Sequence, residues 1–289
     1  KGRRALYISG AIHLGTTPAE QMHPKTGGKE TEKMKVISIF NQKGGVGKST
    51  SAGNLMSEFT KRGKTVLGVD IDPQAHLTKF LVKDADDGAT ICELLSGEAK
   101  FIDVAQGTVY GDIVPSDRSL ATRLKAIADD PAFIFRLRQI LSDECDTYDY
   151  VIIDCPPAVN QLTVAALVAS DYVLIPTEAE YFSMDGVCEI SRTIEQVRGS
   201  KYLNPSLQVL GIFFTRYRSN LTIARDMGAV MEQAAKELFD SQVLQTRIPN
   251  TCDVPESQAA RKAVADYKSN SKAATAYSAL AEEVLEAIE

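Results

Sequence analysis

The segment KGGVGKST, residues 43–50, combines three glycines with two lysines and two hydroxyl side chains. A glycine-rich turn of this kind lets backbone N–H groups point at a phosphate, and a helix that begins there adds the positive end of its dipole. Lys48 would reach the β and γ phosphates of a nucleotide, and the Ser49 hydroxyl would ligate Mg²⁺. The predicted nucleotide-binding residues are Lys43, Gly44, Gly45, Val46, Gly47, Lys48, Ser49 and Thr50.

Three aspartates follow apolar runs further along the chain. Asp70 and Asp72 end the run KTVLGVDID, and Asp154 follows YVII. Residues two apart in a strand share a face, and α/β sheets bind ligands at the carboxyl ends of their strands. An apolar run that ends in aspartate is typical of a Walker B strand, whose carboxylate supports Mg²⁺. No histidine is placed as a general base, so catalysis should depend on positioning and charge neutralisation.

The phosphate loop departs from the general pattern GxxxxGK[ST]. Gln42 occupies the place of the first glycine, and Lys43 directly precedes the paired glycines. In this respect KGGVGKST resembles the deviant phosphate loop of the ParA/MinD family of ATPases. The segments VDIDPQ and VIIDCPP likewise resemble the switch I and Walker B motifs of ParA proteins, in the same order along the chain. The resemblance extends from about Met34 to the C-terminus.

The resemblance implies a role for each of these residues. ATP and Mg²⁺ are the implied ligands, and Lys43, Lys48 and Asp72 are the implied catalytic residues. Lys43 would reach across a face-to-face homodimer to the partner's nucleotide, and Asp72 would position the attacking water. Ser49, Asp70 and Asp154 would hold Mg²⁺, partly through water. Turnover is expected to be slow until a partner protein raises it.

The elements that must position these residues follow from apolar patterning. Strands are expected at 35–40, 64–69, 112–114, 150–153, 172–175, 209–214 and 243–247, and helices at 48–61, 160–169, 183–199, 221–239 and 273–288. This alternation predicts an α/β fold, a doubly wound and mostly parallel sheet flanked by helices, as in P-loop NTPases. A single ParA-type ATPase domain is expected over 34–289. The loops at 175–177, 215–221 and 246–257 lie where ParA proteins carry switch, base-binding and DNA-proximal segments.

Residues 1–33 are expected to form a flexible extension, because 16–33 is polar and rich in glycine and proline. Whether this extension is native to the protein stays open. Its apolar stretch is interrupted at Ser9, Gly10 and His13, which disfavours a signal peptide. It carries six lysines and arginines against three glutamates, so the remaining chain has a net charge of −9 against −6 for all 289 residues.

This acidity excludes a uniformly basic nucleic-acid binder and requires any DNA contact to be local. The ParA resemblance implies sequence-independent DNA binding by the ATP-bound homodimer. Relatives usually carry arginines after the Ile-Pro of the last loop, but here Asn250 and Asp253 follow Pro249. The candidate DNA-binding residues are therefore Arg216, Arg218, Arg225, Arg261, Lys262, Lys268 and Lys272, each of which could instead belong to an ordinary solvated face.

The leading hypothesis is a cytoplasmic, nucleoid-associated partition ATPase that a ParB-like partner stimulates. A ParA-like ATPase that positions a protein cargo is an open alternative. A MinD-like membrane role is disfavoured because residues 276–289 are acidic, and no run of about 18 apolar residues predicts a membrane span. An iron–sulfur carrier is disfavoured because the five cysteines, Cys92, Cys145, Cys155, Cys188 and Cys252, include no CxxC pair. They favour a reducing compartment.

Overall fold

The computed structural model describes residues 33–82, 88–180 and 183–288. Its core is an eight-stranded sheet with the order β3-β4-β2-β5-β1-β6-β7-β8. Every pairing between neighbouring strands is parallel except β3 with β4. The strands are β1 (Lys35–Ile39), β2 (Val66–Asp70), β3 (Gln106–Thr108), β4 (Gly111–Val114), β5 (Tyr150–Asp154), β6 (Tyr172–Glu178), β7 (Gln208–Tyr217) and β8 (Val243–Pro249).

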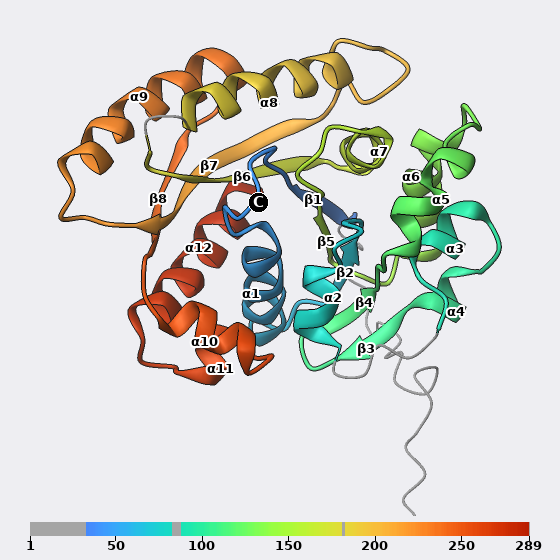
Figure 1. The fold of residues 1–289 in the computed structure, drawn as a ribbon, viewed down its shortest axis with the longest axis horizontal. Coiled ribbons are helices and arrows are strands. Elements are labelled where there is room, and N and C mark those ends of the chain that lie inside the picture. Colours follow the sequence, from blue (N-terminus) through green and yellow to red (C-terminus); the bar gives the residue numbers. More distant parts are fainter. Residues whose placement is uncertain (1–32, 83–87, 181–182, 289) are drawn as a thin grey trace, which may run out of the picture.

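Helices cover both faces of this sheet (Figure 1). The longer ones are α1 (Lys48–Lys61), α5 (Ser119–Ile127), α6 (Phe133–Glu144), α7 (Gln161–Ala169), α8 (Ser183–Arg198), α9 (Thr222–Phe239) and α12 (Lys272–Ile288). The shorter ones are α2 (His76–Leu81), α3 (Ile91–Ser96), α4 (Phe101–Val104), α10 (Asp253–Ala259) and α11 (Val264–Tyr267). The predicted doubly wound, mostly parallel α/β fold is confirmed.

The core has two layers because successive strand residues point to opposite faces. In β1, Ile37 and Ile39 pack with α1 and α12, whereas Val36 packs on the opposite side with α7, α8 and α9. The same alternation runs through β5, where Ile152 joins the first layer and Ile153 the second. Burial of the central strands on both faces explains why their sequences read as continuous apolar runs.

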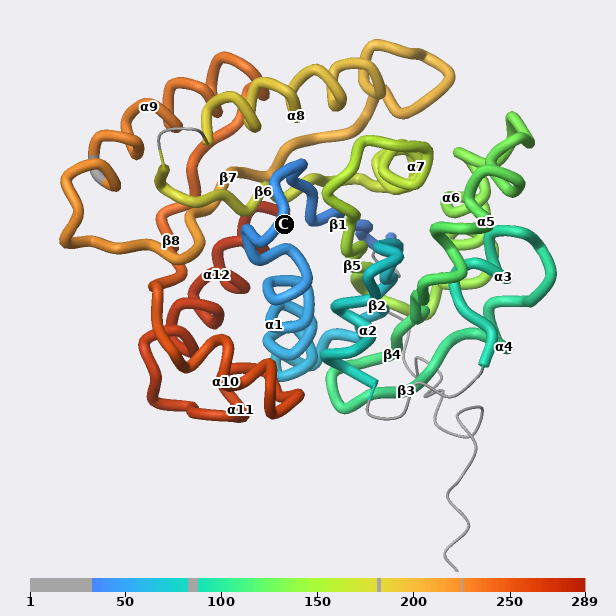
Figure 2. The backbone as a smooth tube through the Cα atoms, in the orientation of Figure 1, coloured from blue at the N-terminus to red at the C-terminus, as the bar shows by residue number. Residues whose placement is uncertain are grey.

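The C-terminal helices close over the first helix of the fold. In Figure 2, α10, α11 and α12 lie beside α1, although about 200 residues separate them in sequence. Asn54 of α1 fixes this arrangement, because its side-chain oxygen accepts the backbone N–H of Val264 at 2.8 Å. The phosphate-loop helix is therefore held from two sides, by the sheet and by the end of the chain.

All strands and helices predicted from the sequence are present, with ends shifted by a few residues. The short helices α2, α3, α4, α10 and α11, the helices α5 and α6, and the strand β3 were not predicted. The predicted extension over 1–33 lies outside the described residues except for Lys33. Within the described part of the chain, no helix is long and apolar enough to cross a membrane.

Candidate active site

The loop between β1 and α1 has the backbone geometry of a phosphate cradle. Gly45 and Gly47 adopt left-handed conformations with φ of 79° and 87°, which residues with a Cβ rarely adopt. Gly47 is the N-cap of α1 and makes no side-chain capping bond, so the first-turn N–H groups remain directed at the loop. This arrangement is an anion-binding site formed by backbone donors and the helix dipole.

Lys48 is the buried cation of this loop. Its ammonium group donates to the carbonyl oxygen of Lys43 at 3.1 Å, and the residue is 6% exposed. Burial lowers the pKa of Lys48, and the charges of Asp154 and Asp72 oppose that effect. A negatively charged phosphate would compensate for the lost hydration of the ammonium group.

Asp154 lies at the carboxyl end of β5, opposite Asp70 of β2 on one side and Ile39 of β1 on the other. It is fully buried, and neither carboxylate oxygen has a hydrogen-bond partner among the residues that the structure describes. Burial raises its pKa well above the usual range, and the Asp70 charge raises it further. The hydroxyl of Ser49 and the ammonium of Lys48 act in the opposite direction.

These orphaned oxygens fit a magnesium site. Mg²⁺ prefers hard oxygen ligands and retains several waters, and buried carboxylates without partners are costly unless a cation or proton compensates them. Asp154 and the Ser49 hydroxyl supply suitable oxygens. Bound Mg²⁺ would neutralise charge on the nucleotide phosphates.

Asp70 has a different set of contacts, which orders the segment that follows β2. Its Oδ1 accepts the backbone N–H of Asp72 at 3.0 Å. Its Oδ2 accepts the backbone N–H and the hydroxyl of Thr78, both at 2.8 Å. Burial raises the pKa of Asp70 to about 6, although these hydrogen bonds lower it. Asp70 therefore ties the Asp72 segment to α2.

Asp72 faces the same cavity as the phosphate loop. Its Oδ1 accepts the backbone N–H of Gln74 at 2.9 Å, and its carbonyl accepts that of Ala75 at 2.8 Å. Ala75 is in the left-handed region with φ of 54°, so this turn is tight. The second oxygen of Asp72 accepts no hydrogen bond from the described residues, which leaves it available to a water molecule or a ligand.

Lys43 points away from Lys48 and toward the end of β6. Its ammonium group lies 2.7 Å from Glu180 Oε2 and 3.7 Å from Glu178 Oε2. The hydrogen bond to Glu180 is the main cause of a raised pKa for Lys43, which therefore carries its charge at neutral pH. The loop thus holds one buried cation inside and one partly exposed cation at its rim.

A cavity of about 690 Å³ opens beside the loop. It is lined by the glycines and Lys48 of the loop, by Asp72, and by the segments after β7 and β8. The expected loops at 215–221 and 246–257 therefore contribute to the nucleotide cavity. The volume suits a nucleotide, because ligand pockets typically measure about 300–1,000 Å³.

Several residues that line the cavity were not predicted from the sequence as site residues, among them Gln258, Tyr277 and Thr251. Gln258 donates to the Thr50 hydroxyl at 2.6 Å, and the Tyr277 hydroxyl lies 3.5 Å from that of Ser51. Thr251 also lines the cavity, and its buried hydroxyl has no hydrogen-bond partner among the described residues. Gln258 and Tyr277 belong to no motif, so only the packing of α10 and α12 against α1 reveals them, whereas Thr251 lies in the loop 246–257 that was expected at the site.

Comparison with known proteins agrees with this geometry. The family model described as an AAA domain matches residues 34–209. The sporulation initiation inhibitor protein Soj of Bacillus subtilis (strain 168) is 35% identical over 253 residues, which cover 86% of this chain and 98% of that protein. The chain belongs to the ParA/Soj family of P-loop ATPases.

Two further comparisons support this family and its ligands. The chromosome partitioning protein ParA of Caulobacter vibrioides (strain NA1000 / CB15N) is 35% identical over 260 residues, covering 87% of this chain and 94% of that protein. A structure titled cobyrinic acid a,c-diamide synthase from Mycobacterium smegmatis, with bound ADP and magnesium, superposes with a TM-score of 0.75. It is 30% identical, and the match covers 88% of this chain and 94% of that one.

The basic residues predicted to contact DNA come from two parts of this ParA/Soj-type fold. The first group lies on and after β7 and comprises Arg216, Arg218 and Arg225; the second lies around α10–α12 and comprises Arg261, Lys262, Lys268 and Lys272. The side chain of Arg225 lies outside the described residues. The two groups are called the surface after β7 and the α10–α12 surface, respectively.

Several of these cations already have partners. Arg216 forms an ion pair with Glu178 at 3.0 Å, and Lys268 forms one with Asp253 at 2.8 Å. Arg218 is exposed, and no described carboxylate lies within salt-bridge distance of it. When the Asn250 side chain is oriented with its amide oxygen toward Arg218, this oxygen accepts two hydrogen bonds from the Arg218 guanidinium, at 2.7 and 2.8 Å.

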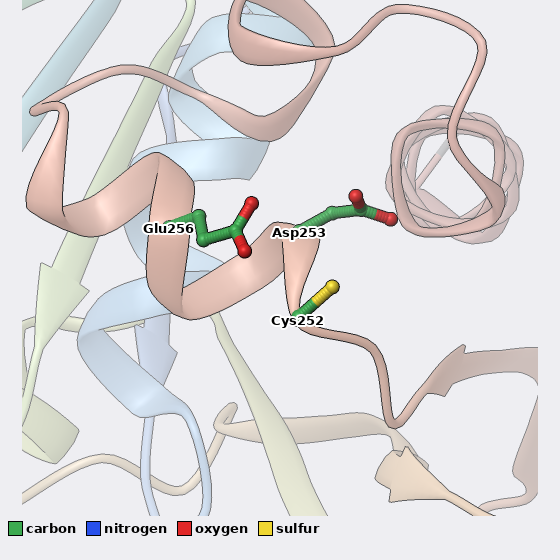
Figure 3. Close-up of side chains that lie close together, drawn as sticks. All are labelled: Cys252, Asp253 and Glu256. Atoms are coloured by element: carbon green, nitrogen blue, oxygen red, sulfur yellow. The ribbon is translucent and has the colours of Figure 1, made fainter.

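Cys252, Asp253 and Glu256 form a compact group at the start of α10 (Figure 3). Asp253 is paired with Lys268, and Glu256 accepts a hydrogen bond of 3.1 Å from the Tyr267 hydroxyl. These contacts hold α11 against α10. They account for both carboxylates without a metal ion.

Proposed function

We propose that this protein is a ParA-type partition ATPase. The ATP-bound protein would form a face-to-face homodimer that binds DNA without sequence preference, and a ParB-like partner on cargo DNA would stimulate hydrolysis and release. Plasmid or chromosome segregation on the nucleoid, in the cytoplasm, is the corresponding role. The names of the Soj and ParA relatives support this proposal.

The position of Lys43 is the main support for this proposal. The phosphate loop has a second cation, Lys43, at its exposed rim, in addition to the buried Lys48 that serves the loop's own nucleotide. Lys43 is about 40% exposed and its nearest partner, Glu180, is 57% exposed, so this ion pair can be exchanged at little cost. This placement suits a lysine that reaches a nucleotide in an opposing subunit.

Different residues bind the phosphates, orient the attacking water and support Mg²⁺ during hydrolysis. The loop N–H groups and Lys48 bind the phosphates and neutralise the charge that develops on them. Asp72, fixed at its backbone by Asp70, orients the attacking water. Ser49, Asp70 and Asp154 support Mg²⁺, with Asp70 acting through water because described donors occupy both of its oxygens. We expect low intrinsic turnover, because Asp72 orients the water and the remaining catalysis depends on positioning and charge neutralisation.

The proposal is tested by binding to random-sequence DNA at low salt, measured by fluorescence anisotropy with Mg²⁺ and ATP or ADP. We expect ATP to promote binding and ADP not to. Lys48→Ala should lose nucleotide binding and therefore DNA binding. Lys43→Ala should bind nucleotide but remain monomeric in light scattering.

Two results would contradict the proposal. Wild-type protein that binds no DNA with ATP at low salt would exclude the partition mechanism. A Lys43→Ala protein that dimerises and hydrolyses ATP like the wild type would remove the role given to Lys43. Asp72→Ala is the matched control, because it should dimerise and bind DNA with ATP while hydrolysing it poorly.

A further inference from the structure

Glu178 is a carboxylate shared between two cations of different loops. It is the last residue of β6, and its side chain is only 12% exposed. Its Oε1 lies 3.0 Å from the Arg216 guanidinium, and its Oε2 lies 3.7 Å from the Lys43 ammonium. Glu180 also binds Lys43. Glu178 therefore connects the phosphate loop to the end of β7.

The end of β7 is itself fastened to the phosphate loop. The hydroxyl of Thr215 lies 2.9 Å from the carbonyl oxygen of Val46 and 3.2 Å from that of Thr177. The methyl group of Thr215 lies close to Gly47. Arg216, the next residue, is consequently placed beside the loop and lines the nucleotide cavity.

The backbone directs Arg216 to this place. Its φ is 48°, a left-handed conformation that is unfavourable for a residue with a Cβ. The register between β7 and β8 shifts between Phe214 and Tyr217, and such irregularities re-aim side chains near functional sites. The strand thus departs from regular geometry at Arg216, whose side chain lines the cavity.

The charges around Glu178 balance only while the cavity holds no anion. Lys43 and Arg216 supply two positive charges, and Glu178 and Glu180 supply two negative ones. Arg216 is 62% exposed, so its ion pair is weak and screened. A nucleotide brings several negative charges, and guanidinium groups bind phosphate oxygens in bidentate geometry.

We propose that Arg216 is a nucleotide-binding residue that exchanges Glu178 for the phosphates of the bound nucleotide, with Glu178 as the counter-ion that holds it before binding. This assigns Arg216 to nucleotide binding instead of DNA binding. The inference rests on the proposed binding of a nucleotide in this cavity, and it is independent of DNA and of any partner protein.

The test is nucleotide affinity, measured with a fluorescent ADP and with unlabelled ADP in competition. Arg216→Asn is the appropriate variant, because asparagine tolerates the left-handed backbone and removes the charge. We expect it to weaken ADP binding roughly tenfold, the effect of one charge-assisted phosphate contact. Arg198→Ala is the control, because Arg198 faces Glu195 on α8 and does not line the cavity, and it should change the affinity less than about twofold.

Glu178→Gln tests the counter-ion role in the opposite direction. Removing the competing carboxylate should tighten ADP binding several-fold in the wild-type background. In an Arg216→Asn background, Glu178→Gln should tighten ADP binding clearly less. Glu178 pairs with both Lys43 and Arg216 in the wild type, and only Lys43 remains in that background. Thermal unfolding without nucleotide checks that each variant is folded.

The outcomes separate this inference from the partition proposal. If Arg216→Asn leaves ADP affinity unchanged and weakens DNA binding with ATP, Arg216 is a DNA contact and the inference is wrong. If Glu178→Gln weakens ADP binding, or acts equally in both backgrounds, the counter-ion role is wrong. A tenfold loss of ADP affinity in Arg216→Asn sustains the inference even where the wild type binds no DNA.

Discussion

At the residue scale, the site contains buried carboxylates whose ionisation is unfavourable until a bound cation compensates their charge. Asp70 and Asp154 are fully buried and face each other across β2 and β5. Their raised pKa values mean that the folded protein binds protons more tightly than the unfolded chain does. Stability therefore falls as the pH rises from the unfolded-state pKa of about 4 through the raised folded-state pKa values, of which that of Asp70 is about 6.

Asp154→Asn should remove much of this penalty. We expect the free energy of unfolding of the nucleotide-free variant to fall less than that of the wild type when the pH rises from 5 to 7.5, because asparagine does not ionise in either state. Urea unfolding at the two pH values measures this, with exposed Asp146→Asn as the control. The same variant should lose ATP hydrolysis. An equal pH dependence for wild type and Asp154→Asn would contradict the raised pKa.

At the element scale, sequence patterning located the central strands and most of the long helices but missed the short helices. It also missed α6, although Phe133, Leu137 and Leu141 recur at helical spacing on its buried face. The central strands are buried on both faces, so they read clearly as apolar runs. The six-residue helix α3 is too short to show periodicity, although Thr90 and Glu93 form a capping box that is visible in the sequence. Helices α10 and α11 depend on distant partners in α1.

The same division applies to the site. The loop 43–50 and the three aspartates were recognisable because each belongs to a short continuous segment at the end of one strand. Gln258 and Tyr277 reach the loop across more than 200 residues, and no local pattern encodes such a contact. The partner of Lys43 could not be predicted either, because it depends on how β6 aligns beside β1.

Asn54→Ala tests how strongly the C-terminal helices support the phosphate-loop helix. Asn54 is 2% exposed, donates to the Thr50 carbonyl at 2.8 Å and accepts the N–H of Val264. Its removal leaves that buried N–H unsatisfied and opens a small cavity, so we expect a loss of about 2–3 kcal/mol in the free energy of unfolding. Denaturant unfolding measures it, and exposed Asn270→Ala should change it by less than about 0.5 kcal/mol.

At the scale of the whole molecule, the chain is acidic, so DNA binding requires a local concentration of cations. Each candidate group contains one cation that already has a carboxylate partner, Arg216 with Glu178 and Lys268 with Asp253. Arg218 has no carboxylate within salt-bridge distance among the described residues and lies beside the neutral Asn250 side chain. Arg218 is therefore a better candidate for a phosphate contact than Lys268, and a dimer would present two copies of it.

The salt dependence of DNA binding distinguishes the two surfaces. Each phosphate contact contributes about 0.9 to the slope of log affinity against log salt concentration, so Arg218→Ala should reduce that slope by about 2 in a dimer that loses two contacts. Anisotropy titrations at 50–200 mM salt with an ATP analogue measure it. Arg198→Ala, whose guanidinium already faces Glu195 on α8, should leave the slope unchanged. An unchanged slope for Arg218→Ala together with a reduced one for Lys272→Ala would place the DNA on the α10–α12 surface instead.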